Sequence, residues 1–299
     1  LASDTGVSTP VDGAFRFNSD SGSNYSDRLQ GDGINLSNIN QSFINSYSTA
    51  STPHADFGYV ANYSSKEKLM IFHHVAQGVA GAGTSPTRGE ITGKWANTSN
   101  SISSIQKYTG SSATWSSGSE LVILGWDPAD THTTNFWTEL ASVNATASST
   151  SIDTGTFTAK KYLWIQAFVK STGNTMGSIS ATFNNDTGST YANRYSDNGG
   201  ADGTITSNQG LILVDGGNLA TNESALINFF IVNVSSKEKL VIGHAVKRNT
   251  AGAGNAPTRR ETAQKWTNTS SQITSFKINR DSGSGTFDTV SQIKIWGSD

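Results

Sequence analysis

The 299-residue chain contains no cysteine, which excludes disulfides, thiolate metal sites and cysteine nucleophiles. Only 15% of its residues are charged, against roughly 25% in an average soluble domain. The formal net charge is −2, and lysine and arginine are scattered, so the chain offers no basic stripe to a nucleic-acid backbone. No apolar run approaches the roughly 18 residues of a membrane-spanning helix. We therefore expect neither sequence-specific nucleic-acid binding nor a membrane span.

Short runs of strand-favouring residues fill most of the chain, and they are separated by segments rich in Gly, Ser, Thr and Asn. This texture is typical of an all-β protein with many tight turns. One or two helical turns are expected only around residues 135–141.

A long internal repeat organises the chain. Residues 62–105 align without a gap with residues 233–276, and 25 of these 44 positions are identical. Such self-similarity indicates two copies of one folding unit. We predict two tandem homologous β-sandwich domains of jelly-roll type, at 1–125 and 136–299, joined by a connector at 126–135.

Each copy is expected to end in an alternating strand, at 118–125 in the first and 290–297 in the second. The fronts of the copies differ, because the apolar strand predicted at 162–169 has no counterpart before Phe17. Either the counterpart strand was lost upstream of Leu1, or the first module is a smaller sandwich with an unpaired edge, which invites another chain. We expect a homo-oligomer with contacts concentrated on residues 1–60. The alternative is that the loop at 35–52 folds back and covers the edge.

Three patterns follow one another in the second copy: an apolar strand (Tyr162-Leu-Trp-Ile165), a Phe-Asn-x-Asp-x-Gly-Ser-x-Tyr-x-x-Arg turn from Phe183, and a closing Ile-x-Ile-Trp-Gly strand that ends at Gly297. Together they resemble the jelly-roll-like structural modules of tailed-phage and archaeal-virus virion proteins. The resemblance implies a capsid, decoration or fibre component, located in a virion or at a cell surface, whose partners are other copies or other virion proteins. The alternative is a carbohydrate-binding fibre or adhesin module that attaches to host glycans.

No catalytic constellation is recognisable: paired carboxylates, a Gly-x-Ser-x-Gly elbow and a metal-type histidine pair are all missing. We expect no enzymatic activity, no cofactor and no metal. The turns that contain Asp20 and Asp186 partly resemble calcium loops. They lack the closing bidentate Glu, so plain turns are the preferred interpretation.

The tryptophans fall into two groups. Some close or lie within predicted strands and are assigned to the structural core, namely Trp95, Trp266, Trp164 and Trp296. The others lack a repeated counterpart and are candidates for a carbohydrate-binding platform, because flat rings can stack on sugars. These are Trp115, Trp126 and Trp137.

Overall fold

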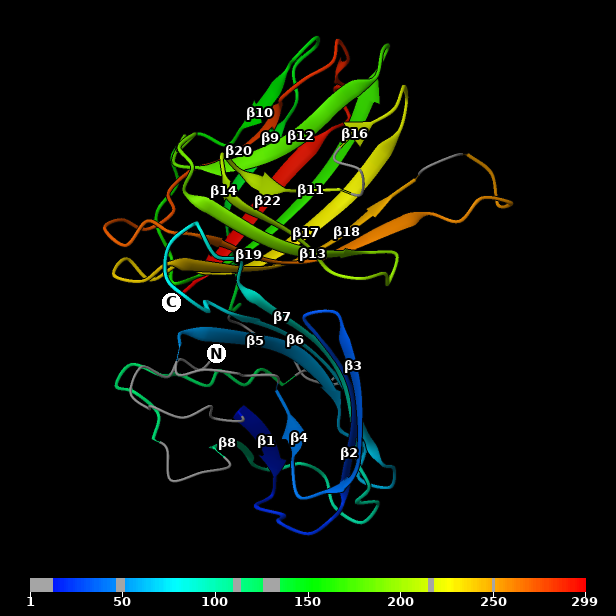
Figure 1. The fold of residues 1–299 in the computed structure, drawn as a ribbon, viewed down its shortest axis with the longest axis vertical. Coiled ribbons are helices and arrows are strands. Elements are labelled where there is room, and N and C mark those ends of the chain that lie inside the picture. Colours follow the sequence, from blue (N-terminus) through cyan, green and yellow to red (C-terminus); the bar gives the residue numbers. More distant parts are fainter. Residues whose placement is uncertain (1–12, 47–51, 110–113, 126–134, 215–217, 249–250) are drawn as a thin grey trace. The chain divides into compact units, whose positions relative to one another are not determined.

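The computed structural model describes residues 13–46, 52–109, 114–125, 135–214, 218–248 and 251–299 (Figure 1). Its regular elements are all β-strands in antiparallel sheets, which confirms the all-β prediction. The described residues contain no helix long and apolar enough to cross a membrane. Two compact units are present. The first comprises Leu1–Val79 and Pro86–Gly125, and the second comprises Trp126–Asp299 together with the hexapeptide Ala80–Ser85.

The first unit consists of a five-stranded and a three-stranded sheet. The strands of the larger sheet are, in spatial order, β3 (Ile34–Gln41), β2 (Tyr25–Gly31), β7 (Thr87–Trp95), β6 (Lys68–Ala76) and β5 (His54–Ala61). Those of the smaller sheet are β4 (Ile44–Asn45), β1 (Gly13–Phe17) and β8 (Ile105–Thr109).

The second unit has the same two-sheet design with more strands. The larger sheet runs β14 (Gly203–Asn208), β13 (Tyr191–Asp197), β19 (Thr258–Trp266), β18 (Lys239–Lys247), β17 (Ser224–Val232), β11 (Tyr162–Thr172), β22 (Gln292–Ser298) and β9 (Thr138–Asn144), with β21 (Thr286–Phe287) beside β11. The smaller runs β10 (Ser151–Asp153), β20 (Phe276–Arg280), β12 (Met176–Phe183) and β15 (Leu211–Ile212), with β16 (Asn218–Leu219) beside β12.

Both cores are built by strand alternation around one tryptophan. Trp95 and Trp266 are each 1% exposed, and each indole packs against the Phe and Tyr on either side of the turn that links the two sheets of its unit, Phe17 and Tyr25 in the first and Phe183 and Tyr191 in the second. Truncating a buried tryptophan to alanine costs about 3–5 kcal/mol. These two side chains therefore anchor the packing of their units.

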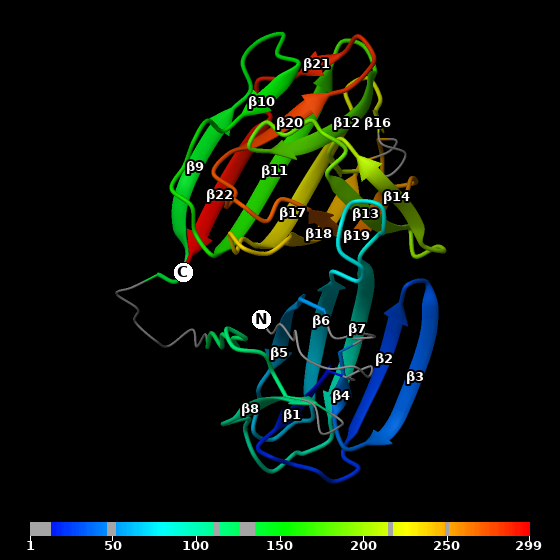
Figure 2. The ribbon, with the colours of Figure 1, turned by 60° about the vertical axis from the view of Figure 1, so that its left-hand side comes forward.

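Four strands of each larger sheet pair in the same order, β2-β7-β6-β5 in the first unit and β13-β19-β18-β17 in the second. Beyond β17 the second unit continues with β11, β22 and β9. Figure 2 shows β5 at the border of the first unit's sheet, where no described residue pairs with its outer edge. Among the described strands of the first unit, none therefore takes the place beside β5 that β11 takes beside β17 in the second.

Two local predictions are wrong. The helical turns expected at 135–141 are replaced by β9, because this segment pairs with β22. The strand expected at 118–125 is not formed, and Ile123 and Leu124 are 57% and 58% exposed. Its sequence counterpart β22 is held between β11 and β9, and the described part of the first unit supplies neither neighbour. Of the expected connector, only Asn135 lies within the described residues.

Candidate functional site

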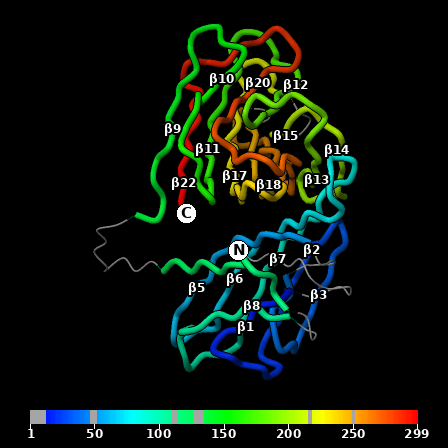
Figure 3. Tube along the Cα trace, turned by 90° about the vertical axis from the view of Figure 1, so that its left-hand side faces the viewer, coloured from blue at the N-terminus to red at the C-terminus, as the bar shows by residue number. Residues whose placement is uncertain are grey.

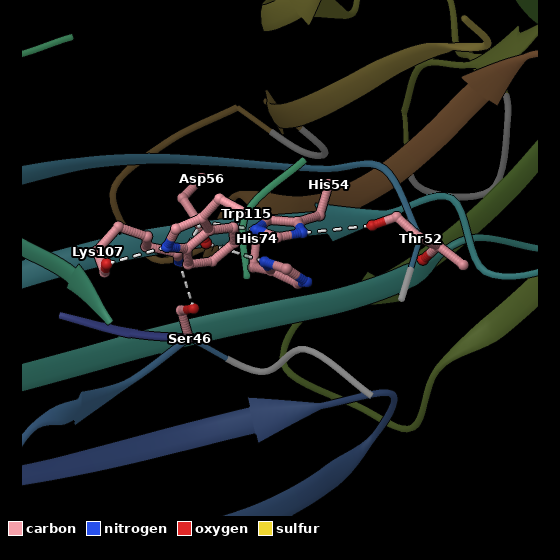
Figure 4. A network of polar contacts seen from close by, with 7 residues as sticks. All are labelled: Ser46, Thr52, His54, Asp56, His74, Lys107 and Trp115. Atoms are coloured by element: carbon pink, nitrogen blue, oxygen red, sulfur yellow. Dashed lines mark hydrogen bonds and ion pairs between the residues drawn. The ribbon is translucent and has the colours of Figure 1, made fainter. Parts of the chain in front are cut away.

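A buried polar network lies in the core of the first unit (Figure 4). Edge strand β5 contributes Asp56, whose Oδ2 accepts a hydrogen bond from Lys107 Nζ at 2.6 Å. Asp56 Oδ1 lies 2.9 Å from Nδ1 of His74 on β6, and Lys107 Nζ also donates to Ser46 Oγ at 2.6 Å. His54, two residues before Asp56, has its Nε2 3.9 Å from Asp56 Oδ2. The network ties β5 to β6 and β8.

The charges in this network stabilise one another. Burial by itself would raise the pKa of Asp56, but the Lys107 ammonium and the His74 ring hold it well below its usual value. Burial lowers the pKa of Lys107, and Asp56 opposes that shift. Burial also lowers the pKa of His54 to about 3, so this imidazole is neutral at physiological pH. Asp56 and Lys107 therefore form a buried ion pair beside a neutral histidine.

The network belongs to the first unit alone. The sequence-matched positions of the second unit hold buried apolar residues, namely Ala225, Ile227, Ala245 and Ile278. In the first unit the side chains of Asp56 and Lys107 are 4% and 6% exposed, so this pair is shielded from solvent by the described residues around it. We assign the network a structural role in holding edge strand β5.

Trp115, one of the candidates for a carbohydrate platform, closes over this network. Its Nε1 donates to the Lys107 carbonyl at 3.2 Å, and its ring centroid is 5.8 Å from that of His54. This position uses the indole for packing. Trp126, the second candidate, lies outside the described residues.

Trp137, the third candidate, belongs to an aromatic row on the outer face of the second unit's larger sheet. Trp164 pairs across the sheet with Phe230 on one side and Trp296 on the other. The Trp164 ring lies 5.8 Å from Phe230 at an interplanar angle of 14° and 4.8 Å from Trp296 at 32°. Trp137 lies 6.0 Å from Trp164.

The core assignment of Trp164 and Trp296 is therefore wrong, since both are half-buried on the outer face while Leu163 and Ile165 point into the core. Trp164 stacks on Phe230 and is flanked by the tilted ring of Trp296, so its ring is engaged with neighbouring aromatic side chains. Carbohydrate binding stays a prediction, and Trp137 is its remaining candidate among the described residues.

The two turns with calcium-like spacing, which contain Asp20 and Asp186, hydrogen-bond to the buried tryptophans of the two cores. Asp20 Oδ2 accepts a hydrogen bond from Trp95 Nε1 at 2.7 Å, and Asp186 Oδ2 accepts one from Trp266 Nε1, also at 2.7 Å. In each turn the other carboxylate oxygen accepts the backbone N–H of the glycine two residues later, at 2.9 Å. Burial opposes ionisation of Asp20, but these bonds lower its pKa on balance. Each aspartate thus fixes a turn and orients a buried indole.

A groove of about 630 Å³ crosses the outer face of the first unit's larger sheet. Its walls include Tyr59, Leu69 and Ile71, which are 63%, 60% and 50% exposed. Lys94 also lines it, and Lys94 Nζ lies 3.2 Å from Glu67 Oε2 with both side chains more than 40% exposed. This combination gives the first unit an apolar surface bordered by one exposed ion pair.

The sequence-matched residues of the second unit are buried. Leu240 and Ile242, which correspond to Leu69 and Ile71, are each 3% exposed. Glu238 and Lys265 form the same ion pair at 3.5 Å with side chains 5% and 0% exposed. Identical residues are thus covered in the second unit and open in the first.

Comparison with protein-family models, with curated proteins and with solved structures finds no match to this chain. The argument for function therefore rests on the sequence and on the geometry described above.

Proposed function

We propose that the chain is a structural building block of an extracellular or virion assembly, made of two homologous jelly-roll-like modules that self-associate. The carrying observation is the open apolar groove at Tyr59, Leu69 and Ile71, whose counterpart is covered in the second unit. Exposed apolar surfaces bordered by polar residues mark interaction sites. Complete burial of a Leu or Ile side chain contributes about 1.5–3 kcal/mol.

The border position of β5 supports the same proposal, because no described strand of the first unit lies beside its outer edge. An unpaired strand presents a row of backbone N–H and C=O groups on which another strand can pair. The polar network beneath β5 keeps this strand in place without a neighbour of the β11 type. The apolar groove and the outer edge of β5, the two surfaces proposed to bind another copy, thus both belong to the first unit.

The setting of the assembly rests on the sequence. The resemblance to virion modules and the low charged fraction of 15% both favour a virion or extracellular location. The binding partners proposed for the chain are other copies of itself or other virion proteins.

Self-association is tested by measuring the molar mass of the full chain by light scattering over a wide concentration range. We expect the mass to rise with concentration and Ile71→Glu to abolish the rise, because the groove would gain a charge. Leu226→Glu is the matched control, since Leu226 is 47% exposed on the outer face of β17. A chain that stays monomeric throughout contradicts the proposal. Glycan binding by that monomer, lost in Trp137→Ala, would establish the adhesin alternative.

A further inference from the structure

The connections that follow β6 and β18 contain nearly the same hexapeptide. Ala80–Ser85 reads Ala-Gly-Ala-Gly-Thr-Ser, and residues 251–256 read Ala-Gly-Ala-Gly-Asn-Ala. Their first glycines share a left-handed backbone, with φ of 91° at Gly81 and 99° at Gly252. Only glycine adopts such angles readily, so the two segments present the same turn.

The first hexapeptide is seated in the second compact unit, where it runs beside β14 (Figure 3). The Gly81 N–H donates to Glu238 Oε1 at 2.6 Å, and the Ala82 carbonyl accepts the Ser207 N–H at 2.7 Å. Both bonds use the backbone of the hexapeptide, so they depend on its shape. A third contact, from Arg194 Nη2 to Ser85 Oγ at 3.4 Å, uses a side chain.

The seat for this hexapeptide is the second unit's version of the groove. Glu238, the acceptor of the Gly81 N–H, is the partner of Lys265 in the buried ion pair. In the first unit the corresponding ion pair, Glu67 and Lys94, is exposed to solvent.

The other two contacts also have counterparts in the first unit. Asn40 corresponds to Ser207, since each precedes the residue that pairs with the repeated Tyr (Tyr25 or Tyr191), and both have a positive φ, 53° and 49°. Arg28 corresponds to Arg194 in the repeated turn motif. The first unit therefore carries a complete backbone-binding seat.

The second hexapeptide is exposed along its whole length, since residues 251–257 are all exposed. Gly81 and Ala82, by contrast, are half-buried. Each chain thus carries one exposed hexapeptide, residues 251–256, and one open groove at Glu67 and Lys94. Their sequence counterparts, Ala80–Ser85 and the Glu238–Lys265 seat, are in contact with each other.

We propose that residues 251–256 of one copy dock into the Glu67–Lys94 groove of a second copy. The Gly252 N–H donates to the Glu67 carboxylate, and the Ala253 carbonyl accepts the Asn40 N–H. The contact of Ser85 with Arg194 is not reproduced, because Ala256 has no hydroxyl. This docking rests on the proposed self-association and would be the contact through which the copies associate.

Such a contact joins two different surfaces, so it is heterologous. Heterologous contacts propagate into rings or open filaments, whereas two-fold contacts stop at a dimer. A hexapeptide supplies far fewer residues than the roughly 20–30 per side of a standard stable interface. The affinity of a single docking contact is therefore low, and the extent of assembly depends on the protein concentration.

Two single variants and their mixture test this contact by light scattering of the full chain. Glu67→Lys removes the acceptor in the groove and repels Lys94, while the hexapeptide stays intact. Ala253→Asp places a carboxylate against Glu67, while the groove stays intact. We expect each variant alone to be monomeric at concentrations where the parent assembles, with unchanged thermal unfolding because both sites are exposed. Ser189→Asp, in an exposed turn of the second unit, is the control and assembles like the parent.

The mixture gives the sharper result. The hexapeptide of Glu67→Lys fits the groove of Ala253→Asp, but neither partner can extend further, so a one-to-one dimer is expected. Assembly of both variants like the parent, or absence of the mixed dimer, overturns the docking while leaving self-association intact. A parent that is monomeric at every concentration overturns the proposed function itself.

Discussion

Lys107 Nζ lies 2.6 Å from Asp56 Oδ2 in the core of the first unit, and the sequence-matched positions in the second unit are Ile278 and Ile227. A buried pair costs free energy to desolvate, and removing one partner leaves an unpaired charge that destabilises by about 3–5 kcal/mol. Replacing both partners by apolar residues is often neutral. This contrast leads to the first prediction.

We expect Lys107→Ile to lower the free energy of unfolding of the first unit by about 3–5 kcal/mol. The double variant Asp56→Ile with Lys107→Ile is expected to recover most of this loss, because it installs the apolar pair of the second unit. Urea unfolding of the parent, both single variants and the double variant measures the coupling. Equal losses in the single and double variants would show that the pair does not act as a unit.

His54 makes the first unit sensitive to acid. Its pKa is about 3 in the folded chain and about 6.5 when unfolded. Between these values the unfolded state binds more protons, so stability falls as the pH drops below 6.5, by about 1.4 kcal/mol per pH unit. Above pH 6.5 the histidine is neutral in both states and contributes no slope.

The control for this prediction is His54→Ala, which installs the residue found at Ala225 in the second unit. Chemical unfolding from pH 7 to pH 4 should show a flatter pH dependence for this variant than for the parent. Parallel curves for the two proteins would assign the acid sensitivity to other groups.

Trp95 and Trp266 should behave as equivalent core residues. We expect Trp95→Ala and Trp266→Ala each to cost about 3–5 kcal/mol, because each indole is 1% exposed and surrounded by aromatic rings. Trp137→Ala, at a half-buried position, serves as the comparison and should cost far less. Thermal unfolding measures all three, and parent-like melting of either core variant would refute the equivalence.

The aspartates of the two repeated turns should matter through hydrogen bonds to indoles and not through a metal. We expect EDTA to leave the melting temperature unchanged. Asp20→Ala should lower the stability of the first unit by about 1.5–3 kcal/mol, since it removes a charged acceptor from Trp95. A melting temperature that falls in EDTA and recovers with calcium would assign these turns to metal binding.

Sequence patterns were sufficient for the all-β class and for the burial of Trp95, but not for the outer face. The run Tyr162-Leu-Trp-Ile165 is apolar on both faces of its strand, so its alternation does not reveal which face enters the core. Trp164 was misassigned for this reason. The strand expected at 118–125 failed because strand formation depends on neighbours that the segment itself does not encode.

The groove was not predictable from single positions. Leu69 and Leu240 both follow Ser-Ser-Lys-Glu-Lys, yet one is open and the other buried, because tertiary contacts decide exposure. The polar network left a clearer signal, since extending the repeat alignment by six residues toward the N-terminus matches Asp56 with Ile227. A charged residue that aligns with an apolar core residue of the other copy is the signal by which the sequence could have predicted the polar network.

The docking of residues 251–256 on a second copy is tested most directly by engineered thiols, because the chain has no cysteine of its own. Ile39→Cys places a thiol in the groove beside Asn40, and Ala253→Cys places one on the hexapeptide. Under mild oxidation the double variant should give a ladder of dimers, trimers and longer species on a non-reducing gel, collapsing to monomer with reductant. Each single variant should give at most dimers. A double variant that forms no species longer than those of the single variants would contradict the account.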